Sequence, residues 1–208
     1  DTIRYRLLSG ATGTWGSVLN TADVDSGTTN KALVSLKLYS SKTRNEKILI
    51  TKHCVGITTS FYAQVWNGSA WGNVQLLSTF GNCSNPQIEN YSGTYQSRSG
   101  DFVVAYSDNS GIPKYRVWNG SSWSAQLSAT NNRQAPQWLQ LESRPTTNEL
   151  MLRTFDSGND VETQYFNGGS YLSTANWAAV TSQTGTGGLA TAQVDDFEWS
   201  PVTPTAGL

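Results

Sequence analysis

The short string Val-Trp-Asn-Gly-Ser-x-Trp occurs twice in this sequence, at Val65–Trp71 and Val117–Trp123, and a weaker copy follows at Tyr165–Tyr171. The three copies are separated by offsets of 52 and 48 residues. A period near 50 residues indicates a repeated supersecondary unit. Asn-Gly between aromatic or β-branched residues is also a strong hairpin signal. It predicts a type I′ turn, because Asn and Gly tolerate the positive φ angles of the two central positions.

The composition suits many short strands joined by tight turns. Among 208 residues, 37% are hydrophobic and only 14% are charged, and the chain has 19 Gly, 8 Trp and 9 Tyr. The length fits one large all-β domain. The net charge of −1 leaves no basic surplus to neutralise a phosphate backbone, so nucleic acid is not an expected partner. No apolar run approaches the roughly 18 residues that span a bilayer, so no membrane span is expected.

Alternating apolar and polar residues predict four strands in each of three repeats, which cover approximately residues 31–80, 85–130 and 135–182. No helical periodicity of useful length is present. The expected strands are 32–38, 47–51, 61–66 and 74–77 in the first repeat, 87–91, 102–106, 114–118 and one after Trp123 in the second, and 137–141, 149–153, 163–166 and 177–180 in the third.

The two ends of the chain hold parts of a fourth repeat, at residues 1–20 and 191–201. Residues 193–201 match residues 137–145, with Gln first, Glu sixth and Pro ninth in both, so a new repeat starts there. Residues 5–8, a Gly-containing turn and Trp15 look like the third and fourth strands of a repeat. The sequence therefore predicts three full repeats plus one split between the termini.

Four-stranded units of this length resemble the blades of β-propellers, with the Asn-Gly-Ser string at the outer hairpin. The Trp-Asn-Gly-Ser-x-Trp strings look like those in blade repeats of large secreted bacterial proteins, and the resemblance covers nearly the whole chain. The pattern departs from WD40 repeats, which carry a Trp-Asp dipeptide. It also departs from the sialidase Asp-box, because in Ser107–Gly111 the Asp follows Ser directly. The resemblance implies a β-propeller-like array of antiparallel blades.

The split blade would be one strand short, which leaves two alternatives. Either the termini meet in one sheet and close a compact four-bladed ring, or an open unit is completed by a neighbouring chain. Closing a ring removes exposed sheet edges. An open blade presents unpaired backbone groups that invite strand addition from another chain.

Cys54 and Cys83 are expected to form a disulfide. If the strands of a blade run alternately up and down, the end of the second strand and the link to the next blade lie on the same face, so the two Cα atoms can approach within about 7 Å. A disulfide places the chain in an oxidising compartment, extracellular or at the cell surface. The sequence begins at Asp1 rather than Met, which we interpret as processing from a precursor.

Asn-x-Ser/Thr acceptors for N-glycosylation occur four times. Two of them coincide with the Asn-Gly-Ser strings, where turn chemistry explains both Asn and Gly. The four positions are Asn67, Asn82, Asn90 and Asn119.

Residues that carry chemistry are scarce. His53 is the only histidine, and it points to the opposite side of its strand from Cys54, so we interpret it as structural. Asp23–Gly27 resembles the start of a calcium loop, but the twelfth position is Val34 instead of Glu, which favours a turn. Asp195 and Asp196 are expected to face opposite ways in a strand. No catalytic residue, metal ligand or cofactor is therefore expected, and we predict that the protein is not an enzyme.

The recurring aromatic residues have two interpretations. A residue repeated in every blade usually packs between blades, and each aromatic buries about 150–250 Å². The alternative is that these rings stack on sugars. The recurring positions are Trp66, Trp118 and Phe166 before the turn, and Trp71, Trp123 and Tyr171 after it.

Two functions follow from these observations. The first is a non-catalytic secreted structural subunit that self-assembles outside the cell, as an extracellular filament or a surface layer, by strand or blade completion. The second is a glycan-binding, lectin-like module. Arg116 aligns with Gln64 and Gln164, so a repeated basic sugar ligand is missing. The candidate binding residues are Trp138, Trp199, Arg116, Asp108 and Asp156.

Overall fold

A computed structural model describes residues 2–25, 31–83, 88–130, 132, 134–178, 181–183 and 196–200. The protein is all-β, as the sequence predicts. In this part of the chain the only helix is a single 3-10 turn, Thr174–Asn176. No helix among these residues has the length and apolar character needed to cross a membrane.

Three four-stranded antiparallel sheets and one two-stranded sheet make up the fold. The N-terminal sheet consists of β1 (Arg4–Tyr5) and β2 (Leu19–Asn20). The first sheet contains β3 (Ala32–Ser40), β4 (Lys47–Val55), β5 (Thr58–Trp66) and β6 (Trp71–Gly81); the second contains β7 (Tyr91–Tyr95), β8 (Phe102–Tyr106), β9 (Lys114–Trp118) and β10 (Leu127–Ser128); the third contains β11 (Pro136–Ser143), β12 (Leu150–Asp156), β13 (Val161–Phe166) and β14 (Thr181–Gln183).

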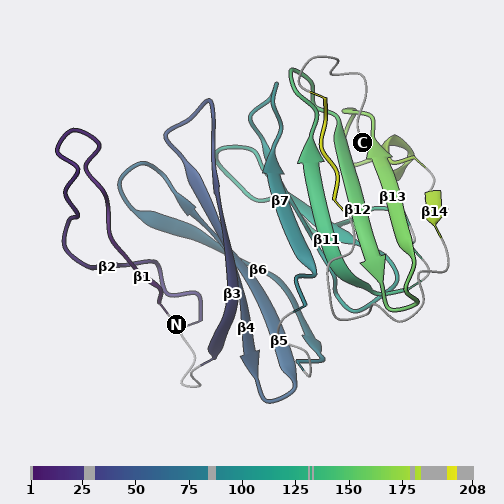
Figure 1. The fold of residues 1–208 in the computed structure, drawn as a ribbon, viewed down its shortest axis with the longest axis horizontal. Helices are drawn as coiled ribbons and strands as arrows, with labels where there is room; N and C mark the ends of the chain where they lie inside the picture. Colours follow the sequence, from purple (N-terminus) through teal and green to yellow (C-terminus); the bar gives the residue numbers. More distant parts are fainter. Residues whose placement is uncertain are drawn as a thin grey trace.

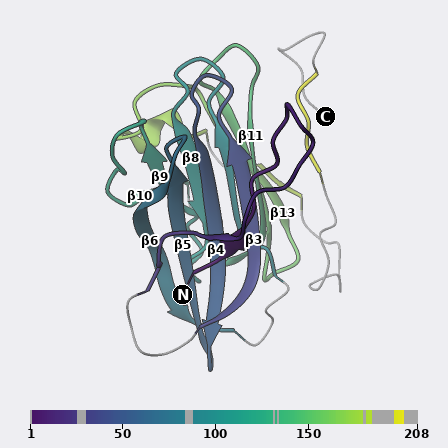
Figure 2. The same cartoon turned by 90° about the vertical axis from the view of Figure 1, so that its left-hand side faces the viewer.

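The sheets form an open array (Figure 1). Successive sheets pack face to face, in a β-propeller-like arrangement, but the array does not close into a ring. The N-terminal sheet lies at one end, across the free face of the first sheet (Figure 2). Residues 196–200 lie at the opposite end, in front of β11 and β12 (Figure 1). The expectation that the termini close a ring within one chain is therefore wrong, because three full sheets keep the two partial repeats apart.

Two apolar clusters hold the array together. Alternate residues of each strand point to opposite faces, so each sheet contributes one face to the sheet before it and the other to the sheet after it. The cluster between the first and second sheets contains Ile48, Ile50, Phe61, Ala63, Val65, Leu77, Tyr91, Phe102, Val104, Tyr106 and Trp118. The cluster between the second and third sheets contains Val103, Ala105, Tyr115, Val117, Ala129, Leu139, Leu141, Leu150, Leu152, Phe166 and Trp177.

Asn67-Gly68 and Asn119-Gly120 lie at hairpin tips, as predicted, but the turns are not type I′. Asn167-Gly168 instead begins a longer connection, in which the Asn167 amide donates to the Asn176 carbonyl at 2.9 Å. Only the glycines have positive φ, 97° at Gly68 and 93° at Gly120, while the preceding Asn does not. Asn67 instead caps the turn, because its Oδ1 accepts from the backbone amides of Ser69 and Ala70, each at 3.0 Å. The same side-chain cap recurs in the second repeat. Asn is therefore selected for its side-chain oxygen and Gly for its φ angle.

One predicted strand is displaced. The alternation of Gln-Ile-Glu-Asn-Tyr predicts a strand at 87–91, whereas β7 begins at Tyr91 and pairs with β8. The carbonyls of Ile88 and Glu89 accept from Lys52 Nζ at 2.6 Å and from the Leu139 amide at 3.2 Å. These backbone groups are thus bonded to neighbouring sheets, and Gln87 itself lies outside the described residues.

The predicted disulfide between Cys54 and Cys83 is present, with a Cα–Cα distance of 6.1 Å. Cys54 lies near the end of β4 and Cys83 just after β6. The amide of Cys83 also donates to the carbonyl of Ile57 in the β4–β5 turn, at 2.8 Å. The bridge therefore ties the link between two sheets to the hairpin of the first sheet.

Replacing both cysteines with serine is expected to lower the free energy of unfolding by about 2–4 kcal/mol, because the unfolded chain regains the freedom that the closed loop removes. The fold should persist, since the two apolar clusters do not include the bridge. Urea denaturation of the wild type and the double variant measures the difference. Non-reducing mass spectrometry that finds two alkylatable thiols in the folded wild type would contradict the bridge.

Candidate functional site

One aromatic side chain per sheet is buried against the sheet before it. Trp66, Trp118 and Phe166 occupy the same place at the end of the third strand, and none is more than 7% exposed. The indole of Trp118 donates to Glu46 Oε2 in the first sheet at 2.9 Å. Glu46 is itself buried, and its Oε1 accepts from Tyr95 at 3.1 Å. The burial of these aromatic side chains therefore agrees with the interpretation that they belong to the core.

The partner of the aromatic changes in the third repeat. Trp66 pairs with Trp71, and Trp118 forms a bridge to Trp123. Phe166 instead forms its bridge to Trp177, so the expectation that Tyr171 takes the equivalent place is wrong. A longer connection with a 3-10 turn, residues 174–176, intervenes. The Tyr171 ring stacks on Phe166 with an interplanar angle of 1° and lies beside this connection.

The N-terminal sheet has the same cross-strand pair of apolar residues at its hairpin, but the pair is exposed. Leu8 forms a bridge to Trp15 in the place that Trp118 and Trp123 occupy in the second sheet. Leu8 is 52% exposed and Trp15 63%, because no sheet in the described part of the chain packs on them. On the other face, the ring of Tyr5 lies 5.9 Å from the ring of Trp66, so the sheet is seated on the first sheet.

The first strand of the first sheet, β3, also leaves apolar side chains exposed. Leu36 pairs with Thr51 and Leu38 with Leu49, as Leu139 pairs with Thr154 and Leu141 with Leu152 in the third sheet. Leu139 and Leu141 are 5% and 1% exposed, whereas Leu36 and Leu38 are 47% and 55% exposed. The third sheet has the second sheet before it. The N-terminal sheet supplies only outer strands, so no inner strand among residues 2–200 that the structure describes covers Leu36 and Leu38.

The C-terminal segment, residues 196–200, lies on the far side of the third sheet. Gln140 Nε2 donates to the Phe197 carbonyl at 3.1 Å, and Arg153 donates to the Asp196 carbonyl. Phe197 is buried. The expected strand at the start of a new repeat is therefore described only in this part, and its residues 191–195 and 201 lie outside the described residues.

The same end of the array carries clustered carboxylates. Burial, and then the nearby charges of Glu198 and Asp196, raise the pKa of Glu142 to about 7, although a hydrogen bond from Gln140 opposes the shift. Glu142 also lines a cavity of about 190 Å³ at the ends of β3, β7 and β11. Negative charge is thus concentrated where the third sheet meets the C-terminal segment.

A groove of about 300 Å³ lies between the second and third sheets near their outer hairpins. Burial raises the pKa of the Asp101 carboxyl despite the opposing charge of Arg44. The hydroxyl of Tyr171 is buried and has no hydrogen-bond partner in the described structure. Leu172 is highly exposed at the rim. The groove is lined by Asp101, Val117, Asn119, Ser122, Ser124, Leu127, Ser170, Tyr171 and Leu172.

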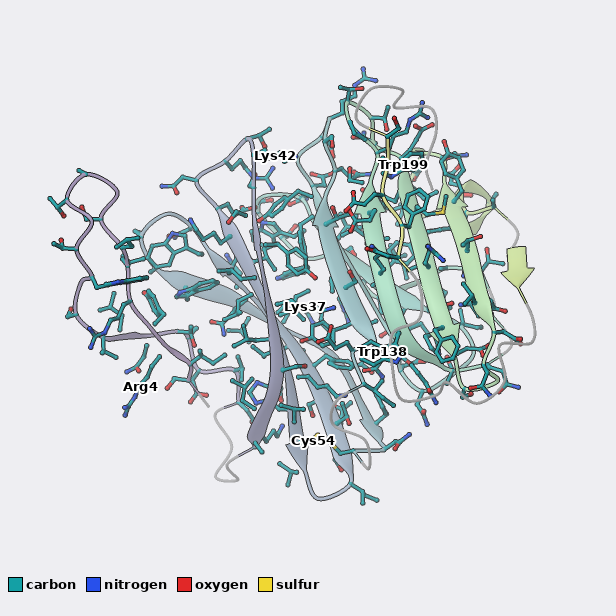
Figure 3. All side chains as sticks on the ribbon, in the orientation of Figure 1. Arg4, Lys37, Lys42, Cys54, Trp138 and Trp199 are labelled. Carbon is teal, nitrogen blue, oxygen red and sulfur yellow. A yellow bond between two sulfur atoms is a disulfide. The ribbon has the colours of Figure 1, made fainter. Side chains whose placement is uncertain are left out.

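The five candidate binding residues do not meet in one place. Trp138 and Trp199 belong to the third sheet and the C-terminal segment (Figure 3). The guanidinium of Arg144 lies over the Trp199 ring, 5.6 Å from its centroid. The indole nitrogens of Trp138 and Trp199 are both buried with no partner in the described structure.

The other three candidates have local structural contacts. Arg116 donates to its own sheet, at the Ser124 carbonyl, at 2.7 Å. Asp108 caps the β8–β9 turn by accepting from the Ser110 amide at 3.0 Å. Asp156 caps the β12–β13 turn by accepting from the amides of Gly158 and Asp160. A role of these residues in ligand binding stays a prediction.

The described chain offers no group of three His, Cys, Asp or Glu side chains that could hold a metal ion. His53 is 2% exposed, and its Nε2 lies 2.9 Å from Thr51 Oγ1. Burial lowers the pKa of His53 to about 4, so the ring is neutral at physiological pH. His53 lies on the face of the first sheet against which the N-terminal sheet packs, and its ring lies 5.5 Å from the Tyr62 ring, which agrees with the structural interpretation.

Neither a protein-family model nor a curated protein matches this sequence. Similar solved structures include a mutant of the Aleuria aurantia lectin in complex with α-methyl-L-fucoside, with a TM-score of 0.48, 11% identity and coverage of 86% of this chain and 51% of that chain. The same lectin with Fucα1-6GlcNAc gives 0.48, 11%, 86% and 52%. A mutant of NanB sialidase from Streptococcus pneumoniae gives 0.43, 14%, 76% and 25%. This chain thus spans about half of the lectin and a quarter of the sialidase.

Replacing Trp118 with alanine is expected to lower the free energy of unfolding by about 3–5 kcal/mol, because the change opens a cavity between two sheets and leaves buried Glu46 without its indole donor. The matched control is Leu8→Ala, at the equivalent but exposed place in the N-terminal sheet, which should cost no more than about 0.5 kcal/mol. Urea denaturation compares the two variants. Equal losses would contradict the assignment of Trp118 to the core.

Proposed function

We propose that the protein is an extracellular structural subunit, without a catalytic role, that associates with copies of itself through its two incomplete ends. The observation that carries this proposal is the contrast in burial at equivalent places. The aromatic position is buried in all three full sheets, and its counterparts Leu8 and Trp15 are exposed at the end of the array.

The apolar surface at this end is concentrated. Most of the large exposed hydrophobic side chains belong to the N-terminal segment or to β3. They are Leu7, Leu8, Trp15, Val18, Leu19, Leu33, Leu36 and Leu38. A patch of this kind on a soluble protein marks an interaction site.

The geometry of the ends favours association in one direction. The N-terminal sheet and the C-terminal segment lie at opposite ends of the array (Figure 1). In sequence, they resemble different strands of one repeat. A contact between the two different ends is heterologous, and such contacts do not close unless rotation brings them back into a ring. The disulfide between Cys54 and Cys83 supports a location in an oxidising compartment.

Removing residues 1–9 is expected to abolish self-association and leave folded monomers, because the deletion takes away β1 and Leu8. Sedimentation velocity across a range of concentrations, with electron microscopy of the concentrated protein, measures assembly. Circular dichroism checks that the truncated chain keeps its strands. Wild-type protein that stays monomeric at every concentration would refute the proposed function.

A second candidate function is glycan binding, and the groove between the second and third sheets favours it. A carboxylate, a tyrosine ring, an amide and an exposed leucine line the groove together. Sugars offer hydroxyl groups and apolar ring faces to such a surface. The five residues singled out from the sequence do not line this groove.

Titration calorimetry with fucose-containing and other oligosaccharides, guided by a glycan array, tests this candidate. Asp101→Asn should weaken binding at least about tenfold, which corresponds to about 1.4 kcal/mol. Asp160→Asn, at a turn outside the groove, is the matched control. An array without any bound glycan, or equal affinities for both variants, would remove the candidate.

A further inference from the structure

The packing of the first sheet on the second, and of the second on the third, shows what a further contact between sheets requires. In each full sheet, the cross-strand pair next to the buried aromatic residue points toward the following sheet. These pairs are Ile48 with Val65 in the first sheet and Val103 with Val117 in the second. All four residues are buried in the clusters that also contain Trp118 and Phe166.

The third sheet has an equivalent pair, Met151 with Tyr165. Both side chains are only half-buried, unlike their four counterparts. The C-terminal segment covers the inner part of this face, where Gln140 and Arg153 bind its backbone. Among the described residues, no full sheet follows the third sheet, so the outer part of the face around Met151 and Tyr165 is open.

Resting on the proposed self-association, we propose that Leu8 and Trp15 of one copy pack on Met151 and Tyr165 of a second copy. The contact would repeat, between chains, the packing of Trp118 on Ile48 and Val65 within the chain. Residues 196–200 of the second copy then provide the inner strand of the junction, beside Leu36 and Leu38 of the first copy.

The occupant is a second copy of this chain because each end lacks what the other end carries. Among the described residues, no inner strand and no preceding sheet cover the N-terminal end. The C-terminal end has the segment 196–200 at the inner position, with Phe197 buried, and no outer strands or following sheet are described there. Arg4 and Trp199, which mark these ends, lie far apart in the molecule (Figure 3). A single chain therefore cannot make the contact with itself in this arrangement.

A mixing experiment with two blocked variants tests the inference. Leu8→Glu places a carboxylate on the N-terminal end, and Met151→Glu places one on the outer face of the third sheet. Each variant alone should be monomeric at concentrations where the wild type assembles, with association weakened at least about tenfold. Mixed together, they should form 1:1 dimers and nothing longer, because each retains one working end. Mass photometry and sedimentation velocity count the species.

Two further variants keep the test decisive. Thr163→Lys, on the same open face, replaces Met151→Glu if that chain does not fold, as judged by circular dichroism. Ile57→Glu, at the exposed β4–β5 turn, is the control and should assemble like the wild type. If the wild type assembles while Leu8→Glu or both third-sheet variants assemble equally well, this contact is wrong and the proposed function stands. Mixed variants that stay monomeric also overturn it. A monomeric wild type refutes both.

Discussion

Burial of one aromatic side chain per sheet against the preceding sheet is the interaction on which the rest of this structure depends. Trp118 combines close packing of its ring with a hydrogen bond from its indole. Its ring fills the space between the first and second sheets, and its indole donates to Glu46, which Tyr95 also binds. A buried carboxylate is costly unless it is hydrogen-bonded, so this contact fixes the register of two sheets as well as their separation.

The described part of the chain leaves sheet faces exposed at both ends of the array. Every sheet has one face for the sheet before it and another for the sheet after it, and an open array must leave one face of each kind uncovered. The N-terminal sheet and residues 196–200 each cover part of such a face. What stays open at one end is apolar, at Leu36 and Leu38, and at the other end is mixed, at Met151, Thr163 and Tyr165. Under the proposed self-association, this asymmetry favours head-to-tail addition over symmetric pairing.

Several local features were predictable because they depend on neighbours in sequence. Strands 102–106 and 114–118 match β8 and β9 at both ends, since their alternation is bounded by turn residues. The hairpin position of Asn67 was predictable, but its turn type was not, because the backbone of Asn67 does not adopt the positive φ that type I′ requires. The start of β7 and the pairing of Phe166 with Trp177 were missed, since both depend on bonds to residues of other strands and on the length of a connection.

Four features could be predicted from the amino-acid sequence, because each follows from spacing and from local backbone preference. They are the repeat, the all-β class, the hairpin tips and the pairing of Cys54 with Cys83. Only the tertiary structure decided that the array stays open, which faces are left uncovered, and that Arg116, Asp108 and Asp156 have separate structural contacts. The physical reason is that exposure is a property of what lies opposite a side chain. Leu8 and Trp118 occupy the same place in their repeats, and only the presence of a preceding sheet makes one exposed and the other buried.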